Sequence, residues 1–268
     1  MDGYAQRSKL LVVDDNEDIL KVLRFLIDSQ TDVEAIYANS LKQAMSMAQA
    51  VRDEIFLTIL DLNLPDAPDG EVVQQILALG LPAIVFTGNF DPQQRQRFLD
   101  MGVVDYVLKD NRMVYEYIMR LINRIRRNSS IKVLVVDDDF EARFRMVKLL
   151  MLQQLQILTA EDGNQAMQLL QQNPDVRLVI TDHAMPEVDG FELVSGIRRH
   201  HGRDAISIIG VSDQDSAVTA QFLKLGASDY LKAPFSQEEF FSRIMLNLEY
   251  LEQVELNQSL QSRCDSLA

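Results

Sequence analysis

The sequence predicts an α/β fold of two doubly wound units in tandem, each a parallel sheet with helices on both faces. Apolar, strand-like runs alternate with segments of helical period through both halves of the chain. In addition, one pattern of carboxylates, a hydroxyl, an aromatic residue and a lysine occurs twice, about 120 residues apart. Alternating strands and helices imply a parallel sheet, because each helix returns the chain to the start of the next strand.

Each half contains five strand and helix pairs. In the first half we expect strands near residues 9–13, 33–37, 55–60, 83–86 and 104–108, and helices near 16–29, 40–51, 70–79, 92–101 and 112–126. In the second half we expect strands near 131–136, 155–159, 176–181, 205–210 and 228–232, and helices near 139–153, 163–172, 189–200, 215–225 and from 236 onward. Reactive loops of doubly wound sheets follow the carboxyl ends of the strands, so polar residues there should converge on one crevice per unit.

The repeat divides the 268 residues into domains 1–128 and 129–246, followed by a helical extension over 247–268. Each domain is long enough to bury its own core. The apolar stripe of the final helix continues through Leu260 and Leu267 with no Gly or Pro to end it. One interpretation is a long last helix with a frayed tail. We favour a signalling helix that pairs with a second copy and leads into an output domain.

Composition and charge argue against several classes of partner. The net charge of −14 is shared by both halves, which disfavours non-specific nucleic-acid binding. The longest apolar runs are of strand length, far below the ~20 residues of a membrane span, and no signal peptide is visible. The single cysteine, Cys264, excludes an intramolecular disulfide and fits a reducing compartment. We therefore expect a cytoplasmic protein that binds neither nucleic acid nor membrane.

Carboxylates follow the first and third predicted strands. In the first half these are Asp14, Asp15 and Asp61, and Thr87 and Lys109 end the next two strands. Three carboxylates in one crevice repel each other unless a cation lies among them, and Mg²⁺ prefers such oxygen ligands. One carboxylate can then attack phosphorus and form an acyl phosphate, while a lysine and a hydroxyl stabilise the phosphoryl charge. Asp61 is the best nucleophile candidate, because it alone ends the central strand.

Taken as an ordered set, these residues and their second copy resemble the receiver domains of two-component response regulators, over nearly the whole chain. The second copy places its carboxylates at Asp137, Asp138 and Asp182, its hydroxyl at Ser212 and its aromatic residue at Tyr230. The resemblance implies a flavodoxin-like (βα)5 fold in each half. Singly, each residue could be a helix N-cap, a solvated side chain or a core tyrosine, but the recurrence of the whole set argues against that.

The resemblance also implies a role for each matching residue. The phosphoacceptors would be Asp61 and Asp182, which also contact the metal. The other Mg²⁺ ligands would be Asp15 and Asp138 directly, Asp14 and Asp137 through water, and the backbone carbonyls of Asn63 and Ala184. The phosphoryl group would be contacted by Thr87, Ser212 and Lys109, and the aromatic residues that swing inward in the active state would be Tyr106 and Tyr230.

The two copies differ at the lysine. Aligning the Asp-Tyr pairs of the fifth strands places Ala233, and not Lys232, opposite Lys109. Because Pro234 fixes this alignment, Lys232 should point to the opposite face of its strand, unless a β-bulge returns it to the crevice. The first site is therefore expected to be complete and the second to be weak or degenerate.

The expected function is a phosphorylation-dependent response regulator. Asp61 would take a phosphoryl group from a histidine kinase or phosphotransfer protein, and the second domain would relay its state to the terminal helix. The resemblance to regulators that join paired receivers to such a helix implies a diguanylate cyclase beyond residue 268, and hence cyclic di-GMP signalling. The receivers themselves should show no turnover beyond self-phosphorylation and self-dephosphorylation.

Other functions remain open at this level. The chain could be an adaptor or a phosphorelay sink without an output domain. A haloacid-dehalogenase-like phosphatase would need a second carboxylate two residues after the nucleophile, where Asn63 and Ala184 stand instead. A nucleotide-binding Rossmann domain would need a glycine-rich motif after the first strand, and neither half has one.

Overall fold

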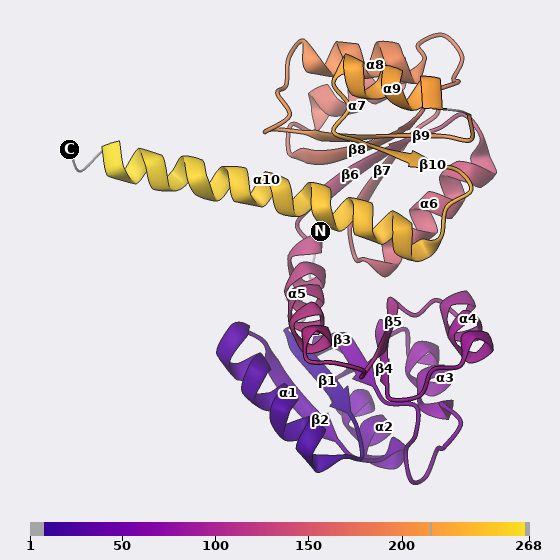
Figure 1. Cartoon of the computed structure of the whole chain (residues 1–268), viewed down its shortest axis with the longest axis vertical. Coiled ribbons are helices and arrows are strands. Elements are labelled where there is room, and N and C mark those ends of the chain that lie inside the picture. The colour runs from indigo at the N-terminus through magenta and orange to yellow at the C-terminus, as the bar shows by residue number, and fades with distance from the viewer. Residues whose placement is uncertain (1–7, 215, 266–268) are drawn as a thin grey trace. The chain divides into compact units, whose positions relative to one another are not determined.

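The structure is a computed structural model that describes residues 8–214 and 216–265. The chain divides into two compact units, and the division falls between Arg127 and Asn128. Each unit contains a five-stranded parallel sheet (Figure 1). The strand order is β2-β1-β3-β4-β5 in the first unit and β10-β9-β8-β6-β7 in the second, which is the same topology. The predicted fold, two flavodoxin-like doubly wound units, is confirmed.

The elements alternate in both units as the periodicity predicts. The first unit contains β1 (Lys9–Val13), α1 (Glu17–Gln30), β2 (Glu34–Ala38), α2 (Leu41–Ala50), a 3-10 turn (Arg52–Glu54), β3 (Ile55–Leu60), α3 (Glu71–Ala78), β4 (Ala83–Thr87), α4 (Pro92–Asp100), β5 (Asp105–Leu108) and α5 (Met113–Asn128). The second contains β6 (Lys132–Val136), α6 (Phe140–Leu152), β7 (Gln156–Ala160), α7 (Gly163–Gln172), β8 (Val176–Asp182), α8 (Gly190–Arg198), β9 (Ser207–Ser212), α9 (Ser216–Leu225), β10 (Asp229–Lys232) and α10 (Gln237–Asp265).

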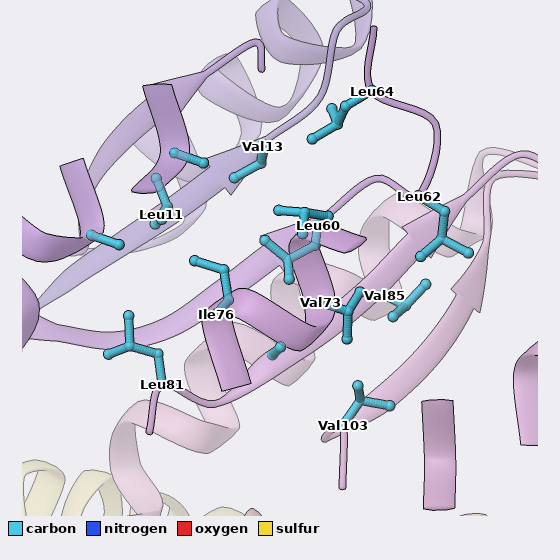
Figure 2. Close-up of a cluster of buried hydrophobic side chains, with 14 of the residues drawn as sticks. Leu11, Val13, Leu60, Leu62, Leu64, Val73, Ile76, Leu81, Val85 and Val103 are labelled. Carbon is cyan, nitrogen blue, oxygen red and sulfur yellow. The ribbon is translucent and has the colours of Figure 1, made fainter. Parts of the chain in front are cut away.

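Helices cover both faces of each sheet, so the central strands are buried on two sides. Alternate residues of β1 point to opposite faces: Leu11 and Val13 pack against α2, α3 and α4, whereas Leu10 and Val12 pack against α1 and α5. Figure 2 shows the first of these clusters, where Leu60 of β3 meets residues of α3. Burial on both faces explains why these strands read as continuous apolar runs rather than alternating ones.

The second unit is built in the same way. Helices α7, α8 and α9 cover one face of its sheet, and α6 and α10 cover the other (Figure 1). The largest difference from the sequence expectation is β9, which was expected near 205–210 and spans Ser207–Ser212. Its small residues, Gly210 and Ser212, favour strands weakly, so the apolar run misplaces the end of the strand by two residues.

Helix α10 is one continuous helix. Its first turns bury Phe240, Ile244 and Leu248 against the sheet, and farther along Leu256 and Leu260 are about half exposed. Leu267, at the end of the expected apolar stripe, lies outside the described residues. None of the described helices combines the length and the apolar character that crossing a membrane requires.

Gly210 of β9 makes room for an aromatic ring. A Cβ atom at this position would lie 2.6 Å from Cγ and 2.7 Å from Cδ1 and Cδ2 of Phe222, inside contact distance. The Phe222 ring is fully buried and its centroid lies 4.8 Å from that of Phe191. The Phe222 side chain of α9 therefore packs directly on the backbone of β9.

We expect Gly210→Ala to destabilise the second unit by ~1–3 kcal/mol, because the buried ring has no exposed direction in which to move. Thermal or urea unfolding of the full chain measures this. The matched control is Gly196→Ala in α8, where the new Cβ would lie 3.7 Å from the Met167 sulfur, an ordinary contact. Equal effects of the two substitutions would contradict the explanation.

Candidate functional site

In the first unit, three carboxylates gather at the carboxyl ends of β1 and β3. Asp14 and Asp61 are 2% and 6% exposed, whereas Asp15 is open to solvent. One carboxylate oxygen from each of the three lies within 4.8 Å of the others. The backbone N–H of Asp61 donates to Val13 O at 2.8 Å, which continues the sheet to the point where the crevice begins.

Lys109 reaches this crevice from the residue after β5. Its Nζ lies 2.6 Å from Asp14 Oδ2 and 2.8 Å from Asp61 Oδ1, and its side chain is only 8% exposed. The backbone N–H of Lys109 donates to Thr87 O at 2.8 Å, so this hydrogen bond to β4 fixes the position of the Lys109 backbone. A single ammonium thus links two buried carboxylates from two other strands.

The pKa of the buried Asp14 carboxyl lies above its ordinary value despite the contact with Lys109. Burial raises the pKa of Asp14 above its ordinary value, and the hydrogen bond and positive charge of Lys109 oppose that rise. The nearby charge of Asp61 raises the pKa of Asp14 further. A bound divalent cation would relieve the same repulsion.

Thr87 is the last residue of β4, and Tyr106 is the second residue of the neighbouring strand β5. Thr87 is fully buried, and its Oγ1 accepts the N–H of Asn89 at 3.3 Å. Tyr106 is also buried, its ring stacks on Phe98, and its hydroxyl donates to Asn89 O at 3.1 Å. The hydroxyl, the aromatic ring and the loop between them are therefore joined.

In the second unit the carboxylates are arranged more openly. Asp137 is buried, the Asp182 side chain is 21% exposed, and Asp138 is exposed. The Asp182 carboxylate accepts the N–H of Ala184 at 2.8 Å, and that of Asp137 accepts the N–H of Asp139 at 2.9 Å. Within the described ranges, Asp137, Asp138 and Asp182 do not bring one oxygen each within 4.8 Å of one another.

Ala233 stands where the first unit has its lysine. In β10, Lys232 pairs with Ser212, just as Leu108 pairs with Thr87 in β5. The next N–H, that of Ala233, donates to Ser212 O at 2.8 Å, matching the bond from Lys109 to Thr87. The pairing of β10 with β9 runs residue by residue without a bulge, and the Lys232 side chain is exposed.

The remaining residues of the second site follow the first. Ser212 is buried, and its Oγ accepts the N–H of Gln214 at 3.1 Å. Tyr230 is buried beside Phe222, and its hydroxyl donates to Ser212 O at 3.1 Å. In the first unit Tyr106 and Thr87 are joined through Asn89, whereas Tyr230 bonds directly to the backbone of Ser212. The second unit therefore keeps the hydroxyl and the aromatic residue and lacks the lysine.

Two charged or titratable side chains near the second site were not predicted. His183 follows Asp182 directly, and its Nδ1 lies 3.5 Å from Asp182 Oδ1 without a hydrogen-bond partner among the described residues. Arg143 of α6 is buried and donates to the carbonyl oxygen of Asp137 and to Glu161. The sequence could have indicated His183, because a titratable residue directly follows Asp182 where the first unit has the apolar Leu62 after Asp61.

The pKa of the buried Asp137 carboxyl lies well above its ordinary value. Burial, followed by the charges of Asp182, Asp138 and Asp139, raises the pKa of Asp137 to about 6, although the N–H of Asp139 opposes the rise. The folded state therefore holds this proton more tightly than the unfolded state. The cost of ionising Asp137 appears as pH rises from about 4 to about 6 and is complete above that range.

We expect Asp137→Asn to stabilise the metal-free second unit at pH 7.5 by ~1–3 kcal/mol, with the gain disappearing toward pH 4. Chemical denaturation in chelator across this pH range measures it. Asp14→Asn is the matched control: it removes a partner of Lys109 as well as a buried charge, so its gain should be smaller. A gain for Asp137→Asn that does not depend on pH would contradict the assignment.

Comparison with known proteins agrees with this geometry. The sequence model of the response regulator receiver domain matches residues 10–116 and 133–245. The transcriptional regulatory protein CpxR of Escherichia coli K12 is 34% identical over 113 residues, which are 42% of this chain and 47% of CpxR. The chemotaxis protein CheY homolog of Campylobacter jejuni is 38% identical over 110 residues, 40% of this chain and 84% of that protein. The chain thus spans about half the length of CpxR.

Solved structures extend the match to both units together. A crystal structure of a two-component system response regulator/GGDEF domain protein is 38% identical, with a TM-score of 0.85, and the match covers 91% of this chain and 99% of that one. A second structure of such a protein has a TM-score of 0.84 at the same identity and coverage. The chain belongs to the response regulator receiver family and carries two receiver domains in tandem.

Proposed function

We propose that this chain is a tandem-receiver signalling module in which Asp61 accepts a phosphoryl group from a histidine kinase or a phosphotransfer protein. The observation that carries the proposal is the arrangement of Asp14, Asp15 and Asp61 in one crevice with the Lys109 ammonium 2.8 Å from Asp61. A carboxylate needs neighbouring positive charge to accept a phosphoryl group. This crevice can supply that charge from the Lys109 ammonium and from a divalent cation bound by the three carboxylates.

The residues of the first site fit a magnesium ion. Asp14, Asp15, Asp61 and the backbone carbonyl of Asn63 are hard oxygen donors, and the exposure of Asp15 leaves room for water ligands. When bound, Mg²⁺ would neutralise the acidic crevice and the charge on the transferred group. In the second unit Asp137, Asp138, Asp182 and the carbonyl of Ala184 would be the corresponding donors.

The chain's own groups would then carry out the transfer. A carboxylate oxygen of Asp61 attacks phosphorus, the bond between phosphorus and the donor imidazole nitrogen breaks, and the imidazole leaves with a proton. The Thr87 hydroxyl and the Lys109 ammonium bind oxygens of the phosphoryl group. Tyr106 would take its inward position against Thr87 in the phosphorylated state. Water later attacks the phosphorus of the acyl phosphate, which releases inorganic phosphate and restores the Asp61 carboxylate.

The second receiver would serve mainly to couple the first to the terminal helix. Asp182 keeps the nucleophile position, and Ser212 and Tyr230 keep the hydroxyl and aromatic positions, but Ala233 offers a methyl group where the ammonium is needed. Phosphorylation of Asp182 should therefore be slow. Helix α10 leads away from this unit with exposed leucines, which supports pairing with a second copy.

We also propose a cytoplasmic location and an output domain of the diguanylate cyclase type following α10, acting through cyclic di-GMP. The support is that both similar two-receiver structures come from response regulator/GGDEF domain proteins. The acidic net charge of −14 supports protein partners over nucleic acid. Activity assays of the full gene product with GTP would test the output.

Asp61→Asn should abolish Mg²⁺-dependent labelling of the first receiver by acetyl phosphate, because the amide cannot form the acyl phosphate. Intact mass and peptide mapping locate the label. Persistent first-receiver labelling in Asp61→Asn would refute the assignment.

Asp15→Asn should weaken Mg²⁺ binding in a calorimetric titration, whereas Asp32→Asn, at an exposed site outside the crevice, should not.

Exchanging the lysine should exchange the behaviour of the two sites. A charge-assisted contact is worth roughly 1.5–3 kcal/mol, so Lys109→Ala should slow Asp61 labelling about 10- to 100-fold. Ala233→Lys should accelerate Asp182 labelling, measured as the rate of label incorporation by mass spectrometry. Lys232→Ala is the control and should change little; loss of Asp182 labelling in that variant would show that Lys232 serves the second site.

A further inference from the structure

The loop that follows Asp61 is held by buried leucines and by backbone hydrogen bonds. Leu62 and Leu64 are buried in the core cluster of the first unit (Figure 2). Leu64 and Ala67 exchange backbone hydrogen bonds of 3.3 and 3.1 Å, and the N–H of Gly70 donates to Leu62 O at 3.0 Å. The loop therefore closes on itself, and Asp66, which lies between Leu64 and Ala67, contacts the start of α2.

Asp66, in this loop, caps α2. Its Oδ1 accepts the N–H of Leu41 at 2.8 Å, and its Oδ2 accepts the N–H of Lys42 at 3.0 Å. Ser40, the residue that precedes the helix, makes no capping hydrogen bond with its own side chain. The N–H groups of Lys42 and Leu41 hold the pKa of Asp66 below its ordinary value, so the cap is a charged carboxylate at the positive end of the helix.

The second receiver lacks this arrangement. There α7 is capped by Asp162, which immediately precedes the helix. The segment Pro186–Asp189 is one residue shorter than Pro65–Asp69. Its loop meets α7 through a backbone hydrogen bond from Gly163 to Val188 O of 3.2 Å and through the Glu187 carboxylate, which accepts the side-chain N–H of Asn164 at 3.0 Å rather than a backbone N–H of the helix. The two hydrogen bonds from Leu41 and Lys42 to Asp66, here called the carboxylate clamp, are thus found in the receiver whose crevice contains the lysine.

We propose that Asp66 is a positioning residue for phosphoryl transfer at Asp61. This inference rests on the proposed function, since it concerns the loop between Asp61 and the clamp. That loop carries the backbone carbonyl of Asn63, one of the proposed Mg²⁺ ligands. With the buried Leu62 and Leu64 on one side and the α2 cap on the other, the carbonyl is held in place before the metal binds, and no ordering of the loop is needed afterwards.

A purely structural role must be separated from this one. Asp66→Ala removes the cap and so weakens α2 as well as releasing the loop. Ser46→Gly, at an exposed position of the same helix, weakens α2 through glycine's backbone freedom and leaves the cap in place. Asp66→Asn keeps one acceptor oxygen and should retain part of the effect. Labelling of Asp182 in the same molecules is an internal control.

The measurements are the Mg²⁺ concentration that gives half-maximal labelling of Asp61 by acetyl phosphate, and hydrogen exchange of the amides of residues 63–67. Asp66→Ala should raise that concentration about 10-fold and accelerate loop exchange, because substitutions of groups that orient metal ligands typically have effects of this order. Asp66→Asn should fall between it and the unsubstituted chain. Ser46→Gly should change neither quantity.

Two results would overturn the inference: unchanged loop exchange in Asp66→Ala, or an equal shift of the Mg²⁺ requirement in Ser46→Gly. Failure of the proposed function looks different, because then the unsubstituted chain itself is not labelled at Asp61. In that case loop exchange and the calorimetric Mg²⁺ affinity of the same variants still decide whether Asp66 positions the loop.

Discussion

The ammonium of Lys109 between Asp14 and Asp61 is the interaction on which the first receiver depends. Two nearly buried carboxylates cannot both ionise cheaply at the end of an apolar sheet, and the cost falls when a positive charge lies within hydrogen-bond distance of both. The same charge would hold a phosphoryl group against Asp61. The stability of the folded unit and the proposed phosphoryl transfer thus both require the positive charge of Lys109.

The second receiver shows what happens when the sheet is kept and that charge is lost. Its strands have the same order and its hydroxyl and tyrosine are buried as in the first unit, yet Asp137 has no ammonium beside it and its pKa rises to about 6. The missing ammonium follows from the position of the lysine in β10. Pairing of Lys232 with Ser212 leaves the next position, the one that faces the crevice, to Ala233. Since side chains alternate along a strand, a displacement by one residue is enough to take the ammonium out of the crevice.

Most of the fold could be predicted because its signals are local. Apolar runs and helical periods mark the elements, and residues at strand ends, such as Asp61 and Thr87, must converge once the sheet is parallel. Contacts between distant segments could not be predicted in this way. Asp66 caps a helix that begins 25 residues earlier, and the proximity of Arg143 to Glu161 depends on how helix α6 meets the loop after β7. In β9, Gly210 leaves room for the Phe222 ring and interrupts the apolar run, so the pattern concealed the end of the strand.

The uninterrupted course of α10 has a consequence for the angular phase of anything joined to it. The helix continues for fourteen residues after Leu251, its last buried residue in the described part, and ends at Asp265, a rise of about 21 Å. Each residue of a straight helix turns its successor by about 100°. Inserting one residue in this stretch would therefore rotate an attached segment by more than a right angle while moving it about 1.5 Å, whereas inserting seven would nearly restore its orientation.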